Sequence, residues 1–351
     1  MAYTTINKST DYFNTKLYTG NGNSNHAQTG VGFQPDLLWN KSRSSGDNHL
    51  LFDAVRGITK TISSDLSSAE ATRDSTFLTS FDSDGFTVGS NGNVNGSGTT
   101  FTNWCWKANG AGSANTDGSI SSTVSANTTS GFSIVSYTGT GANASIGHGL
   151  GVAPKVVLIK SLSSTEDWSF YFLDTSVAYN NVNNYLELNT TNASAGDSGA
   201  RFGVYSNFTT STFGVGNDNA TNASGSNYIA YCFVDVQGYS KIGKYTGNGS
   251  SDGTFVYTGM KSAFVMVKRT DSTSDWTIFD NKRPGYNLIN KALYPNGEWA
   301  EGTGDALDFT SNGFKWRVNS SAYNGSGGDY IYMAFAEAPL VGTNNVPANA
   351  R

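Results

Sequence analysis

The stretch Tyr18-Thr19-Gly20-Asn21-Gly22 decides the fold, because the chain contains it three times. The two later copies keep the same pattern and are Tyr137–Gly141 and Tyr245–Gly249. A lysine follows each tyrosine at a distance of 23 residues, at Lys41, Lys160 and Lys268. Two landmarks that keep one separation indicate an internal repeat, and such self-similarity determines the architecture of a chain.

Each repeat contains the same succession of short apolar runs. One run precedes the lysine, a second ends in an aspartate, a pair of phenylalanines brackets a turn, and an aromatic run closes the repeat. In the first copy these are Leu37–Trp39, Leu50–Asp53, Phe81 with Phe86, and Trp104–Trp106. Apolar runs of this length, bounded by Gly and Pro, are typical of strands buried on both faces. We therefore expect an all-β chain of three tandem antiparallel β-sandwich domains, jelly-roll-like, of about a hundred residues each.

The repeat predicts three domains at residues 1–118, 119–239 and 240–351, called the first, second and third units below. The lead-in before Tyr18 is expected to add a strand to the first unit. The stretch 109–130 is rich in Gly, Ser, Thr and Asn and is typical of a flexible linker. The best helix candidates are short, at Ser67–Asp74 and Asn287–Leu293.

Composition excludes several classes of function. The chain has 351 residues, only 14% of them charged, a net charge of −5 and no basic stripe, which argues against nucleic-acid binding. No apolar run reaches the roughly 18 residues of a membrane helix. Met1–Asp11 is polar and lacks the core of a signal peptide, which predicts synthesis in a cytoplasm. Cys105 and Cys232 occupy equivalent places in two units and are expected to be buried thiols without a disulfide.

Motifs that could carry chemistry are weak, so we predict no catalytic residue, metal site or cofactor. His26, His49 and His148 show no metal-ligand spacing. The Gly-x-Ser-x-Gly match at 249–253 lacks the strand-turn-helix context of a nucleophile elbow. The Asp82-Ser83-Asp84-Gly85 stretch lacks the closing glutamate of a calcium loop and is typical of an Asx-type turn.

The repeated lysines and aspartates favour a structural role. A catalytic pair is not normally kept in every unit of a repeat, whereas antiparallel strands could bring Lys41 near Asp53 as an ordinary ion pair. The equivalent pairs are Lys160 with Asp174 and Lys268 with Asp280.

Aromatic residues outside or beside the shared strands are the candidate contacts for a glycan or a partner protein, because aromatic faces stack on sugars and anchor interfaces. The alternative is that they are core residues of longer middle segments. The candidates are Trp168, Trp276, Trp299, Tyr179, Tyr185 and Tyr286.

The first unit resembles a family of proteins from marine bacteriophages, cyanophages especially. The resemblance rests on Met1–Ile6, Tyr18–Gly22, Pro35–Arg43, Leu51–Gly57, Phe81–Gly89 and Trp104–Ala108. The second and third units resemble the family only in outline. The resemblance implies a virion appendage, such as a tail fibre, or a capsid-surface protein, and it implies no catalytic residue.

We therefore expect a structural virion protein that aids host attachment and is not an enzyme. Its expected partners are further copies of itself and other virion proteins, and a host surface glycan is a third candidate. No nucleic acid or membrane insertion is expected, and the expected location is the virion after synthesis in the host cytoplasm. The alternatives are a carbohydrate-binding module and a glycan-degrading enzyme.

Overall fold

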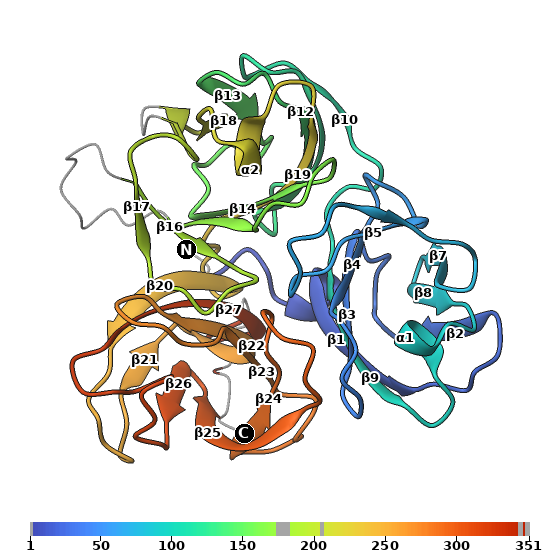
Figure 1. Ribbon diagram of the computed structural model, residues 1–351. Coiled ribbons are helices and arrows are strands. Elements are labelled where there is room, and N and C mark those ends of the chain that lie inside the picture. Colours follow the sequence, from blue (N-terminus) through green and yellow to red (C-terminus); the bar gives the residue numbers. More distant parts are fainter. Residues whose placement is uncertain (1–2, 173–182, 204–206, 343–346, 348–351) are drawn as a thin grey trace.

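A computed structural model describes residues 3–172, 183–203, 207–342 and 347 (Figure 1). In this part of the chain the fold is all-β and its sheets are built of antiparallel strands, as predicted. Helical structure among the described residues is scarce: the 3-10 helix η1 (Ser9–Asp11), a further 3-10 residue at Asn207, and the four-residue helices α1 (Gly92–Asn95) and α2 (Asn219–Asn222).

One strand order recurs in the three units and forms what we call the inner sheets. It is β1-β9-β3-β4 in the first unit, β12-β19-β14-β15 in the second and β20-β27-β22-β23 in the third. The bounds are β1 Phe13–Thr19, β9 Thr100–Trp106, β3 Leu37–Ser42, β4 Leu50–Asp53, β12 Phe132–Thr138, β19 Asn227–Phe233, β14 Val156–Ser161, β15 Ser169–Phe172, β20 Ser240–Thr246, β27 Asp329–Pro339, β22 Met260–Arg269 and β23 Thr277–Asp280.

Each unit also has an outer sheet, in the order β2-β8-β7, β13-β18 or β21-β26-β25-β24. Their bounds are β2 His26–Thr29, β8 Gly85–Val88, β7 Leu78–Asp82, β13 Ala144–Gly147, β18 Thr212–Val215, β21 Phe255–Tyr257, β26 Gly313–Trp316, β25 Gly302–Thr310 and β24 Ile289–Ala292. The remaining strands are β5 Lys60–Thr61, β6 Ala71–Thr72, β10 Ser113–Asn115, β11 Ser122–Asn127, β16 Asn183–Glu187 and β17 Ala195–Asp197.

The apolar runs of the sequence become these strands. All six residues of β3 and of β14 are buried, as expected for strands covered on both faces. The phenylalanine pairs of the first and third units face each other across hairpins, Phe81 opposite Phe86 and Phe309 opposite Phe314. Cys105 and Cys232 are free and buried, as predicted, and burial raises the pKa of the Cys232 thiol to about 12.

The two faces of each inner strand contribute to different cores, because side chains alternate along a strand. On β3, Leu38 packs in a cluster confined to the first unit, whereas Leu37 and Trp39 pack in a central cluster shared by all three units. The same alternation occurs on β14 and β22, where Val157 and Val265 face their own unit's core. Figure 1 shows the outcome as three lobes around a common centre, in blue, green and orange to red.

Two local predictions are wrong. The stretch 109–130 is not a linker, because β10 and β11 extend the inner sheet of the second unit through β12 and bury Val124. The helix candidates form strands instead, with β6 inside Ser67–Asp74 and β24 inside Asn287–Leu293. In both cases pairing with a neighbouring strand outweighs local composition.

The lead-in forms part of β1, as predicted, and its first residues reach the other units. Phe13 stacks against Phe335 at 5.2 Å between ring centroids, and the Thr4 hydroxyl donates a hydrogen bond to the Gln237 carbonyl at 2.6 Å. The domain limits at 118 and 239 stay a prediction.

Candidate functional site at the junctions between units

Aromatic and aliphatic side chains from the three inner sheets meet at the centre of the molecule. Trp106 of the first unit lies 5.7 Å from Phe264 of the third, and Phe233 of the second lies 5.8 Å from Phe335. The cluster encloses a cavity of about 20 Å³, room for about one water molecule. Its lining includes equivalent residues of the three units, Leu37, Val156 and Phe264, so the cavity lies where the inner sheets converge.

Around this centre, the three repeated lysines are fully buried and each reaches into a neighbouring unit. The Lys41 ammonium donates to the Glu298 carbonyl at 3.0 Å, that of Lys160 to the Ser67 carbonyl at 3.0 Å, and that of Lys268 to the Thr191 carbonyl at 3.2 Å. The first unit thus contacts the third, the second contacts the first, and the third contacts the second. The three lysine contacts therefore close a ring.

Backbone hydrogen bonds repeat this ring. The Glu301 amide donates to the Arg43 carbonyl at 2.8 Å, the Glu70 amide to the Leu162 carbonyl at 3.1 Å, and the Ser194 amide to the Thr270 carbonyl at 2.8 Å. The geometry is the same at each junction. The acceptor lies two residues after the lysine, as Arg43 does after Lys41. The donor lies three residues after the carbonyl that this lysine contacts, as Glu301 does after Glu298. We call the donor segments, residues 63–70, 187–194 and 294–301, the docking loops.

Burial makes the charged form of the three lysines less favourable. It lowers the pKa of Lys41, Lys160 and Lys268 to about 8 each, and nearby carboxylates only partly offset this effect. Within the described ranges, none of these lysines has a carboxylate within ion-pair distance. Each ammonium instead donates also to the carbonyl of the residue after it, as Lys41 does to Ser42 at 2.9 Å.

The expected Lys–Asp ion pair is therefore wrong. Strand register places Asp53 opposite Leu37, four residues before Lys41. The Asp53 carboxylate accepts a hydrogen bond from Arg56 at 2.5 Å and one from the hydroxyl of Tyr231, in the second unit, at 2.7 Å. Asp280 is bonded in the same way, by Arg283 at 2.7 Å and by the Trp104 indole of the first unit at 3.0 Å. Asp174 lies outside the described residues.

Two candidate contact residues, Trp168 and Trp276, are buried and belong to the same junctions. The Trp168 indole donates to the Ser63 carbonyl of the first unit at 2.8 Å, and the Trp276 indole donates to the Glu187 carbonyl of the second at 2.9 Å. They are 0% and 1% exposed, so neither is available to a glycan or another chain. For both residues the alternative of a core position holds, because the preceding unit covers the segments that carry them.

His49 takes the tryptophan position in the first unit. Its ring accepts a hydrogen bond from the Trp39 indole at 2.8 Å. Burial, together with the charge of Lys41, holds the pKa of His49 well below its usual range, while a backbone hydrogen bond at Tyr294 acts in the opposite direction. His49 is therefore a neutral core residue at the junction with the third unit.

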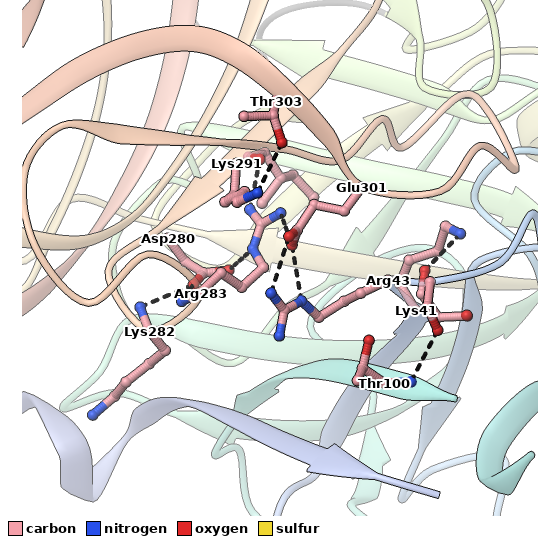
Figure 2. Close-up of polar contacts among 12 residues, drawn as sticks. Lys41, Arg43, Thr100, Asp280, Lys282, Arg283, Lys291, Glu301 and Thr303 are labelled. Carbon is pink, nitrogen blue, oxygen red and sulfur yellow. Dashed lines mark hydrogen bonds and ion pairs between the residues drawn. The ribbon is translucent and has the colours of Figure 1, made fainter. Parts of the chain in front are cut away.

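At the junction of the first and third units, two arginines converge on one carboxylate (Figure 2). Arg43 binds Glu301 through two hydrogen bonds of 2.8 and 2.9 Å, and Arg283 approaches the same carboxylate at 3.3 Å. Figure 2 shows Arg283 continuing to Asp280, so charged groups of the two units form one chain. Bidentate Arg–carboxylate pairs of this kind fix geometry as well as contributing energy.

The other candidate contacts lie in different surroundings. Trp299 is 52% exposed on a docking loop, with its ring 5.6 Å from that of Tyr294. Tyr286 is 78% exposed and precedes β24 of the third unit by three residues. Tyr185 is half-buried under the Arg201 guanidinium, 4.1 Å from the ring centroid. Tyr179 lies outside the described residues.

The weak chemical motifs occupy turns and loops. The Asp84 carboxylate accepts hydrogen bonds from the backbone amides of Gly30 and Gly32, which hold its pKa below the usual range. In the third unit, Asp252 pairs with Lys315 at 2.6 Å beside Ser250. Among the residues that the structure describes, no group of three or more His, Cys, Asp or Glu side chains could hold a metal ion. The helices described are all too short or too polar to cross a membrane.

The sequence contains one signal of the docking loops that the predictions above do not include, a recurring Asn–Asp pair. Asn189 binds Asp167 at 2.7 Å, and Asn296 binds Asp275 at 2.7 Å. In the first unit the two residue types are exchanged, because Asn48 binds Asp65 at 2.6 Å. Such a compensating exchange between repeats indicates spatial contact, and it would have placed the docking loops beside the strand that follows each lysine.

Comparison with known proteins identifies a family whose function is unknown. A family model described as "Domain of unknown function (DUF7483)" matches residues 8–339, which span all three units. The chain belongs to this family. No curated protein matches the sequence.

Proposed function

We propose that this chain is a structural protein of a bacteriophage particle, exposed as a tail fibre or capsid-surface appendage and aiding host attachment. The support from sequence is the resemblance of the first unit to marine phage proteins. We further propose that its three units are tandem β-sandwiches of the jelly-roll type. The recurring order of the inner sheets and the separate apolar cluster of each unit support this interpretation.

The observation that carries the proposal is the commitment of the repeated polar residues to the junctions. Lys41, Lys160 and Lys268 are fully buried, and each contributes an ammonium to a neighbouring unit. These contacts favour a rigid body in which the outer surface is the part that contacts other molecules. A body of this kind would suit an exposed particle component, because a load on one lobe would spread to the other two.

Imaging tests the proposal directly. Antibodies against the purified chain should label intact particles of the phage that encodes it, at the tail or on the capsid surface in electron micrographs. Particles disrupted before labelling serve as a control for access. Labelling only of host cell debris, with the chain missing from purified particles by mass spectrometry, would contradict the proposal.

The second candidate is a carbohydrate-binding module, which the exposure of Trp299 and Tyr286 favours. Aromatic rings that remain exposed in the folded chain can stack on sugar rings. A glycan array should then give binding that Trp299→Ala or Tyr286→Ala weakens. A reducing-sugar assay on each bound glycan separates binding from glycan degradation, the third candidate.

A further inference from the structure

We propose that the free edge of β21, in the outer sheet of the third unit, binds an extended segment of a partner polypeptide as an added strand. The inference does not depend on the phage assignment, because it rests on a comparison of the three units. Strands β2, β13 and β21 are equivalent, since each pairs with the strand that follows the polar turn of its unit. Each lies at the edge of its outer sheet.

In the second unit, the chain itself covers this edge. The Ile120 amide donates to the Ser145 carbonyl of β13 at 3.0 Å, and the Ser145 amide donates to the Ser119 hydroxyl at 2.9 Å. Ile120 forms a parallel bridge with Ile146 and is buried in the core of the unit. A short extended segment with one aliphatic side chain thus continues the sheet.

In the first unit, side chains protect the edge. The Lys16 ammonium donates to the Thr29 carbonyl of β2 at 2.6 Å, and the Asn14 amide group donates to the Val31 carbonyl at 3.0 Å. Lysines at strand edges are a common protection against unwanted strand pairing.

In the third unit, only part of this cover is present. Gly243 takes the place of Lys16, opposite Tyr332, whose ring lies over the glycine. Within residues 3–172, 183–203, 207–342 and 347, β26 is the only strand that pairs with β21. The Tyr3 hydroxyl approaches that of Tyr257 and donates to the Gly259 carbonyl at 2.7 Å, as the Asn14 amide group does to Val31 in the first unit. No described side chain donates to the Tyr257 carbonyl in the way that Lys16 donates to Thr29.

Hydrogen bonding to β26 shows which backbone groups of β21 face outward. Trp316 donates to the Thr254 carbonyl at 3.1 Å, and Thr258 donates to the Asn312 carbonyl at 2.9 Å. Because residues of an antiparallel strand alternate in the direction of their backbone groups, those of Phe255 and Tyr257 point away from β26. Unpaired groups in such a row form a template for another strand.

The side chains of β21 also differ from those of its equivalents. Phe255 and Tyr257 are 45% and 57% exposed. The first unit has Ala27 and Thr29 at these positions, and the second has Ser145 and Gly147. The shared strand order therefore does not require large aromatic side chains here. They supply an apolar flank for an added strand, which suits a segment of small polar residues around one aliphatic residue, as in Asp117–Ile120.

Amide hydrogen exchange, read residue by residue by NMR, tests the proposal on the full chain. The probe is a synthetic peptide with the sequence of residues 113–124. In the free protein, the amides of Phe255 and Tyr257 should exchange rapidly, whereas that of Val256 is protected by β26. Peptide that occupies nine-tenths of the sites should slow exchange at Phe255 and Tyr257 about tenfold.

Two variants test whether the backbone edge is responsible. Phe255→Pro removes an outward amide that is not bonded to β26, so the variant should keep its β-sheet circular dichroism and lose peptide binding. The matched control is Ala27→Pro on β2, which should leave binding unchanged. The double variant Phe255→Ala with Tyr257→Thr carries the side chains that the first unit has at these positions, so it should fold. It keeps both outward amides but loses the aromatic flank, and it should bind the peptide more weakly.

Three outcomes would overturn the proposal. Protection of Phe255 and Tyr257 in the free protein at every concentration would mean that the chain covers its own edge. Protection that grows with protein concentration would assign the edge to a second copy. Unchanged exchange at millimolar peptide would mean that the edge does not accept an added strand.

Discussion

The three buried lysines are the residues on which the junctions depend most. A buried ammonium is costly unless its hydrogen bonds are satisfied. In Lys41, Lys160 and Lys268 the acceptors are backbone carbonyls of two units, which fixes the position of one chain segment against another. Carbonyl acceptors stabilise the charged form less than a carboxylate does, which is consistent with a pKa lowered to about 8.

Replacing Lys41 by methionine should destabilise the fold by about 1–3 kcal/mol, because carbonyls that accept from the ammonium lose a donor. The free energy of unfolding in urea measures the effect. Lys8→Met is the matched control, since Lys8 is exposed and should change stability by no more than about 0.5 kcal/mol. We expect no glycan-cleaving activity to depend on Lys41. Equal stability of the two variants would show that the buried hydrogen bonds contribute nothing.

The lowered pKa values predict how stability depends on pH. Between pH 8 and the unfolded pKa near 10.5, the unfolded chain binds more protons at these lysines than the folded chain does. Stability should therefore rise with pH in this window, by about 1 kcal/mol per lysine from pH 8 to 9. Buried Cys105 and Cys232, whose pKa values are raised, oppose the rise above about pH 9.

Urea titrations at several pH values measure this rise, and Lys41→Met should reduce it by about one third because one of three groups is removed. The Lys8→Met variant should follow the natural protein throughout. A profile for Lys41→Met that keeps the full rise would show that the lysines do not change their charge in this window.

At the scale of elements, the docking loops determine how the units meet. Each loop receives a lysine and donates a backbone amide at its far end, whatever its side chains are. Trp299 lies on the docking loop of the third unit, and Ser68 and Asn192 occupy the equivalent positions in the other two units. The fold therefore does not require a tryptophan at this place, which leaves its exposed ring available for contact.

Substitutions of two junction tryptophans, Trp276 and Trp299, distinguish a role in stability from a role in contact with another chain. Trp276→Ala should cost about 3–5 kcal/mol, because a fully buried ring leaves a cavity. Trp299→Ala should cost about 1 kcal/mol or less and keep the β-sheet signal, while weakening association of the chain with itself or with another virion protein. Urea unfolding and analytical ultracentrifugation measure the two effects. A large loss of stability in Trp299→Ala would place this residue in the core.

At the scale of the whole molecule, the sequence predicted the strands but not the closed ring of contacts between the three units. The runs around Leu37, Val156 and Phe264 indicated strands buried on both faces, and this is confirmed. What covers the second face was not predictable, because the covering groups are far apart in sequence. Lys41 and Glu298, for example, are 257 residues apart. The acceptors there are backbone carbonyls, which every residue has, so side-chain patterns carry no trace of them.

Closure of the ring predicts that the chain unfolds as one cooperative unit. Separate tandem domains would each keep their own core and unfold at their own temperatures. Here one face of every inner sheet packs in the shared central cluster, so loss of any unit exposes Trp106, Phe233 or Phe335 of the other two. Thermal unfolding followed by far-ultraviolet circular dichroism and by tryptophan fluorescence should therefore give coincident midpoints. Lys41→Met, at a single junction, should lower both midpoints equally. Two separated transitions, with only one moved by Lys41→Met, would mean that the units are energetically independent.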